Sequence, residues 1–111
     1  LAVVIGKRCK DVPEEKAWDV IAGYTILNDV TARDLGALEK QGGHMFLAKT
    51  FDRFAPLGPW MITRDAIPDP MHLRIQTRVN GETRQDGNTR DMLFSIPQLV
   101  AHFSQITLMP G

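Results

Sequence analysis

The sequence predicts an α+β fold built around a mixed, mainly antiparallel β-sheet. The first observation is a clean alternation over residues 71–80, which places Leu73, Ile75, Thr77 and Val79 on one face of a strand. The second is the dipeptide Asn80-Gly81, which predicts a hairpin turn with residues 82–85 as the returning strand. The third is a set of short helical patterns with recognisable ends. Short strands, short helices and many turns together favour this class.

The other elements follow in chain order. Residues 1–5 form an apolar run typical of a buried strand. Pro13 opens a helix, with Glu14 and Glu15 near its positive end, and Gly23 is expected to end it. A short strand is expected over residues 24–27.

Two more helices are predicted in the remainder of the chain. One begins at Thr31 as N-cap, with Asp34 three residues later in a variant of the capping box. The last begins at Ser95 and places Leu99 and Phe103 on one face.

Size and charge limit the possible functions. The chain has 111 residues, of which 43% are hydrophobic, so it predicts a single domain over residues 1–111. Thirteen basic and thirteen acidic side chains cancel, which argues against nucleic acid or an anionic membrane as partner. The single cysteine and the absence of a long apolar run favour a reducing compartment, and we expect the cytoplasm.

The two ends of the chain suggest a longer protein. A buried strand is expected to begin at Leu1 with no polar lead-in, and the chain stops at the turn signal Met109-Pro110-Gly111. We therefore expect residues 1–111 to be a piece of a longer protein.

Candidate functional residues lie between residues 29 and 50. Phosphate loops, paired zinc-binding cysteines, HExxH and GxSxG motifs are absent from the sequence. If the chain is helical from Asp29, that carboxylate and Arg33 stand four residues apart on one face, either as a surface ion pair or as two groups that converge on one ligand. Lys49 lies among apolar residues, where it either snorkels from a strand or is held as a positive charge for an anion. Spacing alone leaves these alternatives open.

The chain resembles the catalytic domain of the fumarylacetoacetate hydrolase family. Five blocks stand in the expected order, and they read "LAVVIGK", "IAGYTILNDVTARD", "KTFDRFAPLGPW", "VNGETRQDGNTRDMLFSI" and "TLMPG". The resemblance implies a β-sheet roll or sandwich with short helices and a homodimer. It also implies a divalent cation, Mg²⁺ or Mn²⁺, and hydrolysis of a C–C bond in a small diketo or 2-oxo acid. A decarboxylase or isomerase of the same family, acting on a 2-oxo or 2-hydroxy-diene dicarboxylate in aromatic catabolism, is the alternative.

The resemblance also assigns roles to individual residues. Asp29 corresponds to a metal ligand, Arg33 and Lys49 to the cations that face substrate and oxyanion, and Thr50 to a substrate-binding hydroxyl. A single carboxylate cannot complete the octahedral coordination that a cation such as Mg²⁺ requires. The family's other metal ligands and its lid residues match no position of this chain, and Gly36 stands where the family usually has glutamine. These departures leave a third hypothesis, a non-catalytic remnant of the scaffold.

Overall fold

A computed structural model describes residues 1–44 and 46–111 of the chain. Those residues form two compact units, one from residues 1–24 and 61–111 and the other from residues 25–60. The described strand pairs are antiparallel and the helices are short, so the predicted α+β class is confirmed. The single domain expected over residues 1–111 stays a prediction.

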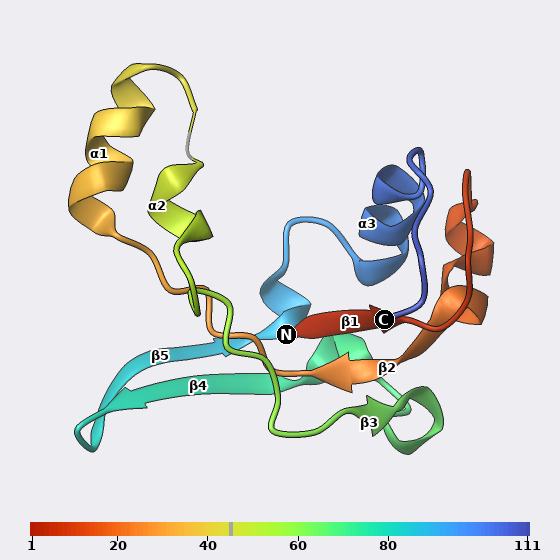
Figure 1. Cartoon of the computed structure of the whole chain (residues 1–111). Helices are drawn as coiled ribbons and strands as arrows, with labels where there is room; N and C mark the ends of the chain where they lie inside the picture. Colours follow the sequence, from red (N-terminus) through yellow and green to blue (C-terminus); the bar gives the residue numbers. More distant parts are fainter. Residues whose placement is uncertain (45) are drawn as a thin grey trace. The chain divides into compact units, whose positions relative to one another are not determined.

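The first unit contains a sheet with the strand order β1-β2-β3 (Figure 1). These strands comprise β1 (Ala2–Ile5), β2 (Ile21–Thr25) and β3 (Ile62–Thr63). Gly23 lies opposite Thr63 in the antiparallel β2–β3 pair, and a Cβ at Gly23 would collide with the Ile62 carbonyl. The expectation that Gly23 ends a helix is therefore wrong, because its missing side chain lets two strands approach closely.

The segment before β2 is a 3₁₀-helix, η1 (Glu14–Val20), that begins after Pro13 as predicted. It carries Glu14 and Glu15 in its first turn, but it ends at Val20 because Ile21 already belongs to β2. The strand expected over residues 24–27 therefore begins three residues earlier. Three shorter 3₁₀ turns connect other parts of this unit, namely η2 (Arg64–Ala66), η3 (Pro70–His72) and η4 (Thr89–Asp91).

The predicted hairpin is present in the first unit. Strands β4 (Arg74–Val79) and β5 (Glu82–Asn88) pair antiparallel and run side by side in Figure 1. Asn80 and Gly81 have φ values of 51° and 84°, the left-handed backbone that a tight hairpin turn needs. The returning strand is longer than expected, since pairing continues to Asn88.

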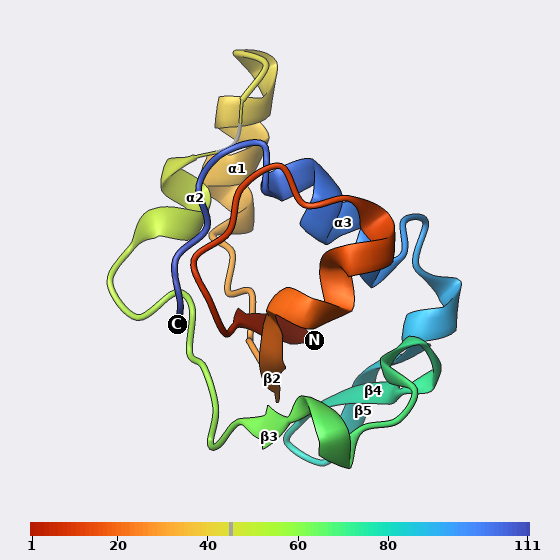
Figure 2. The ribbon, with the colours of Figure 1, turned by 90° about the vertical axis from the view of Figure 1, so that its right-hand side faces the viewer.

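The core of the first unit lies between η1 and helix α3 (Ile96–Phe103), which are in contact and are seen together in Figure 2. Ser95 caps α3 through a capping box with Gln98, which confirms the predicted helix start. The buried core residues are Val12, Ala17, Val20, Ile21, Tyr24, Ile96 and Val100. At the end of the chain, the Gly111 N–H donates to the Ile5 carbonyl at 3.0 Å.

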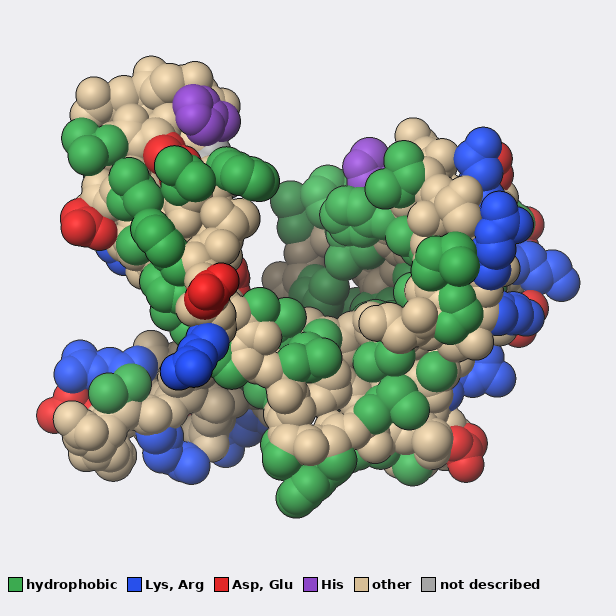
Figure 3. All heavy atoms as spheres, in the orientation of Figure 1, with side chains coloured by type: hydrophobic (Ala, Val, Ile, Leu, Met, Phe, Trp, Pro, Cys, Tyr) green, Lys and Arg blue, Asp and Glu red, His purple; other side chains and the backbone are tan. Residues whose placement is uncertain are grey.

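The second unit holds helices α1 (Arg33–Gln41) and α2 (Leu47–Thr50), which are in contact with each other. The N-cap of α1 is Ala32 rather than Thr31, because the Thr31 hydroxyl donates to the Asp29 carbonyl at 3.2 Å instead. Figure 3 shows hydrophobic side chains on the surface of these two helices. Leu38 and Phe46 are 65% and 64% exposed, so this unit has little core of its own.

Candidate functional site

The second unit is organised by an extended segment that leads into α1. Backbone N–H groups of Asn28 and Val30 donate to the carbonyls of Pro56 and Phe54, at 3.0 and 3.2 Å. The Ala32 N–H donates to the Ala48 carbonyl at 2.9 Å. These bonds run along the segment that contains α2, and they bring Asp29 opposite Lys49.

Lys49 meets two side chains of that extended segment. Its Nζ pairs with Asp29 Oδ2 and donates to Thr31 Oγ1 at 3.0 Å. The Lys49 side chain is 34% exposed and that of Asp29 is 66% exposed, so solvent reaches the pair. A carboxylate, a hydroxyl and an ammonium group thus lie together at one point on the surface of this unit.

This geometry decides between alternatives that the spacing left open. Asp29 is not helical, because α1 begins at Arg33, and the carboxylate pairs with Lys49 instead of forming an i, i+4 pair on a helix. Lys49 belongs to α2 and not to a strand. A local spacing argument missed the pair because its partners are twenty residues apart.

Glu39 holds α2 in position, a role that the sequence argument did not predict. Its carboxylate accepts the backbone N–H groups of Phe46, Leu47 and Ala48 at 3.2, 2.7 and 3.0 Å. These hydrogen bonds lower the pKa of the Glu39 carboxyl, the bond from Ala48 contributing most. The carboxylate satisfies N–H groups that the start of a helix leaves free, which positions the turn that carries Lys49. Glu39 lies within α1, seven to nine residues before the amides that it binds, so no local sequence pattern marks this contact.

The two other predicted site residues lie on the same unit. Arg33 is the first residue of α1 and is exposed. Thr50 is the last residue of α2, next to Lys49, and its hydroxyl lies 3.5 Å from the Leu47 carbonyl. All four predicted residues are therefore carried by residues 25–60.

A divalent cation would find few ligands among the described residues. No group of three or more His, Cys, Asp or Glu side chains in the described part of the chain is arranged to hold a metal. The Asp29 carboxylate and the Thr31 hydroxyl are oxygen ligands of the kind that Mg²⁺ and Mn²⁺ prefer. They fit such an ion in kind but not in number, because octahedral coordination needs six donors.

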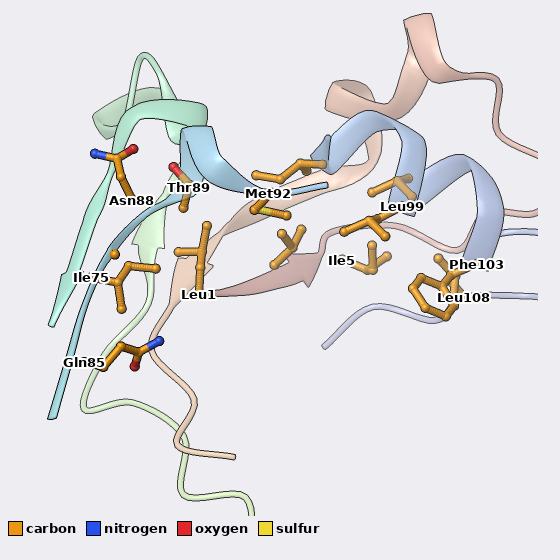
Figure 4. Close-up of a pocket in the computed structure, with 14 residues that line it drawn as sticks. Leu1, Ile5, Ile75, Gln85, Asn88, Thr89, Met92, Leu99, Phe103 and Leu108 are labelled. Atoms are coloured by element: carbon orange, nitrogen blue, oxygen red, sulfur yellow. The ribbon is translucent and has the colours of Figure 1, made fainter. Parts of the chain in front are cut away.

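The first unit contains a cavity of different character, about 570 Å³ in volume (Figure 4). It is lined by residues of β1, the β4–β5 hairpin and α3, among them Ile5, Ile75 and Phe103. None of its described lining residues has a charged side chain, so it offers neither an acid nor a base for chemistry.

Within the part of the chain that the structure describes, no helix is long and apolar enough to cross a membrane.

Comparison with known proteins identifies the family. A family model described as the fumarylacetoacetate hydrolase C-terminal domain matches residues 1–111. The chain belongs to this family, as the resemblance implied.

Curated relatives from Burkholderia cenocepacia and Burkholderia orbicola, named "putative hydrolase", are 47% identical over 112 residues. The chain is covered completely by this match but spans 39% of the length of those relatives.

Solved structures of the family show the same fold. A 5-carboxymethyl-2-hydroxymuconate delta-isomerase from Mycobacterium smegmatis matches 98% of this chain and 41% of its own, with 44% identity and a TM-score of 0.87. Maleylpyruvate hydrolase from Sphingobium sp. SYK-6, in complex with manganese(II) and pyruvate, matches 98% of this chain and 38% of its own, with 40% identity and a TM-score of 0.86. The relatives are thus enzymes that include both hydrolases and isomerases, and a divalent metal occurs in the family.

Proposed function

We propose that the chain is part of a divalent-metal-dependent hydrolase that cleaves a C–C bond in a small diketo or 2-oxo acid of the acylpyruvate type. The observation that carries the proposal is the cluster of Asp29, Lys49 and Thr31, with Arg33 at the start of the adjoining helix. A relative 40% identical holds manganese(II) and pyruvate, a 2-oxo acid, which supports this substrate class.

Asp29 would supply one oxygen ligand to Mg²⁺ or Mn²⁺, and the remaining ligands would have to come from outside the cluster of Asp29, Thr31 and Lys49. The bound cation would polarise the carbonyl group of the substrate. Lys49 provides a fixed positive charge where an oxyanion or enolate develops, and a preorganised charge of this kind stabilises a transition state strongly. Asp29 and Thr31 hold the Lys49 ammonium group at that point.

Arg33 and Thr50 would orient the substrate. The forked guanidinium of Arg33 can contact a carboxylate at two points, and its exposed position on α1 leaves it accessible. Thr50 adds a hydroxyl beside Lys49. These two residues would fix which carbonyl of a diketo acid faces the metal and the Lys49 ammonium group.

A second candidate function is an isomerase or decarboxylase acting on a 2-oxo or 2-hydroxy-diene dicarboxylate. The delta-isomerase from M. smegmatis, at 44% identity, favours it. The same cations would stabilise the enolate that such reactions share with C–C hydrolysis.

Product analysis separates the candidates. The complete protein with Mn²⁺ would be mixed with an acylpyruvate and, separately, with a 2-hydroxy-diene dicarboxylate. Hydrolysis consumes one water and releases pyruvate and a carboxylic acid, decarboxylation releases CO₂, and isomerisation leaves the mass unchanged. Absence of all three reactions would favour the remnant hypothesis, which the small number of metal ligands in the described residues motivates. A homodimer and a cytoplasmic location stay predictions.

A further inference from the structure

Ala48 is held from two sides immediately before Lys49. Its N–H group donates to Glu39 Oε2 at 3.0 Å, and its carbonyl accepts the Ala32 N–H at 2.9 Å. Ala48 is also fully buried. The point of the backbone from which the Lys49 side chain starts is therefore fixed by one hydrogen bond from the interior of α1 and another from the residue that precedes α1.

Glu39 binds three consecutive amides at the start of α2. Its Oε1 accepts the Leu47 N–H at 2.7 Å, while Oε2 accepts those of Phe46 and Ala48 at 3.2 and 3.0 Å. Both carboxylate oxygens are thus engaged with a single turn of the chain. Glu39 follows Arg33 by six residues on the same helix, so α1 carries both a cation proposed to orient the substrate and the group that holds α2.

The contact depends on the charge of Glu39. An amide group at this position has one acceptor oxygen in place of two, and its NH₂ group would face at least one backbone N–H. Hydrogen bonds to a carboxylate are also about twice as strong as those between neutral groups. Because the three bonds lower the pKa of the Glu39 carboxyl, this group is ionised at neutral pH and the contact is formed there.

Lys49 needs this support to keep its ammonium group in one place. Its Nζ pairs with Asp29 and donates to Thr31 Oγ1 at 3.0 Å. The Asp29 carboxylate is exposed, and an exposed ion pair restrains a flexible lysine side chain only weakly. A backbone fixed by Glu39 removes the motion of the turn itself and leaves only the Lys49 side chain to be ordered.

We propose that Glu39 is a positioning residue for the reaction, whose carboxylate fixes the backbone of residues 46–48 and thereby holds the Lys49 ammonium group where the oxyanion or enolate develops. The inference rests on the proposed function, in which Lys49 stabilises that charge. Glu39 acts through Lys49 and not on the substrate itself. A displacement of about 1 Å at a reacting group can reduce a rate by about 100-fold, so a loosened α2 is expected to be felt in catalysis.

The test is a double-mutant cycle in the complete protein, with Mn²⁺ and an acylpyruvate. Glu39→Gln should lower kcat by about 10- to 100-fold and change KM by less than about threefold, because Arg33 and Thr50 still orient the substrate. In the Lys49→Met background the same change should lower kcat by less than about twofold, since the group that Glu39 positions is gone. Glu15→Gln, the same exchange at an exposed residue of η1, is the matched control and should leave both constants unchanged.

A second readout follows the Lys49 side chain without any turnover. An NMR cross-relaxation (NOE) signal between the ε-methylene protons of Lys49 and the β-proton of Thr31 should be present in the unmodified protein, since Nζ and Oγ1 are hydrogen-bonded. In Glu39→Gln this signal should fall to about half or less. It should be unchanged in Glu15→Gln.

The outcomes separate the inference from the proposed function. If kcat is unchanged in Glu39→Gln, or falls equally with and without Lys49, the positioning role is refuted and the proposed function stands. If the unmodified protein has no turnover, the proposed function is refuted, and the NOE alone decides whether Glu39 holds Lys49. An NOE that is equally strong in Glu39→Gln refutes the inference in either case.

Circular dichroism shows whether each variant is folded. If Glu39→Gln does not fold, Glu39→Asp takes its place in the cycle. It keeps two acceptor oxygens on a side chain that is one methylene shorter, so its effect on kcat should be smaller and should again vanish in the Lys49→Met background.

Discussion

Lys49 Nζ pairs with the carboxylate of Asp29 across twenty residues of chain, and it also donates to Thr31. The pair joins α2 to the extended segment that precedes α1. Its exposure leaves both charges accessible to a small ligand.

The first prediction concerns the Lys49 charge. Lys49→Met should lower kcat by about 10²- to 10³-fold, because a preorganised charge opposite the developing oxyanion is lost. Binding of Mn²⁺ should persist, since Asp29 remains. Steady-state kinetics with an acylpyruvate measures the loss, and Lys16→Gln serves as a control. An unchanged kcat in Lys49→Met would exclude the role proposed for this residue.

The second prediction concerns Glu39 and pH. Its carboxyl pKa lies below the ordinary value of 4.5 because three backbone N–H groups bind the charged form. The stabilisation of α2 is therefore complete above pH 4.5 and is lost as pH falls through the lowered pKa. Hydrogen exchange, corrected for intrinsic rates, should show protection of the Leu47 and Ala48 amides at pH 6 that disappears in Glu39→Gln. Asp34→Asn is the matched control, and equal protection in both variants would contradict the contact.

The third prediction concerns the β4–β5 hairpin. Arg74 donates to both oxygens of Asp86, at 2.8 and 2.6 Å, and this contact lowers the pKa of the Asp86 carboxyl to about 2. The resulting stabilisation is present above pH 3.8 and is lost as pH falls toward 2.

An NMR titration of the Asp86 side chain should give a midpoint near 2, and Arg74→Met should move it toward 3.8. Arg84→Met, which removes the partner of Glu82 on β5, should leave that midpoint in place. A midpoint near 3.8 in the unmodified chain would show that the two hydrogen bonds from Arg74 to Asp86 do not form in solution.

The fourth prediction concerns Ser104, which is fully buried. Its hydroxyl accepts the Val12 N–H at 2.8 Å and donates to the Ala101 carbonyl at 3.0 Å. Ser104→Ala leaves the Val12 N–H without that acceptor, so it should lower the free energy of unfolding by about 1–3 kcal/mol. Urea unfolding measures the change, and the exposed neighbour Gln105→Ala should change it by less than about 0.5 kcal/mol. A similar small change in Ser104→Ala would refute the role of this hydroxyl.

Local chemistry made part of the fold predictable. Asn80-Gly81 determines a hairpin because both residues adopt positive φ, and Ser95 determines a helix start because its hydroxyl accepts an amide three residues later. Both signals involve residues that are neighbours in sequence. The order of the family blocks likewise directed attention to Asp29, Arg33 and Lys49, which lie in one compact unit.

Contacts distant in sequence made the rest unpredictable. Gly23 resembles a helix stop in the sequence, but in the structure the close approach of the Ile62 carbonyl explains why this position has no side chain. Thr31 resembles an N-cap, but its hydroxyl accepts a hydrogen bond from Lys49, eighteen residues along the chain. Glu39 carries no motif, and its role depends on the backbone of residues 46–48. In each case the partner is fixed by the folded chain and not by spacing.

The most direct test of the central claim is calorimetric titration of Mn²⁺, followed by oxalate as a diketo-acid mimic, into the complete protein and its Asp29→Ala variant. The account predicts that Mn²⁺ binds the unmodified protein, that oxalate binds only after the metal, and that Asp29→Ala weakens Mn²⁺ binding by about 100-fold or more. Asp34→Asn, a nearby exposed carboxylate, should bind Mn²⁺ normally. Equal Mn²⁺ affinity in the unmodified protein and in Asp29→Ala would contradict the assignment of Asp29 as a metal ligand.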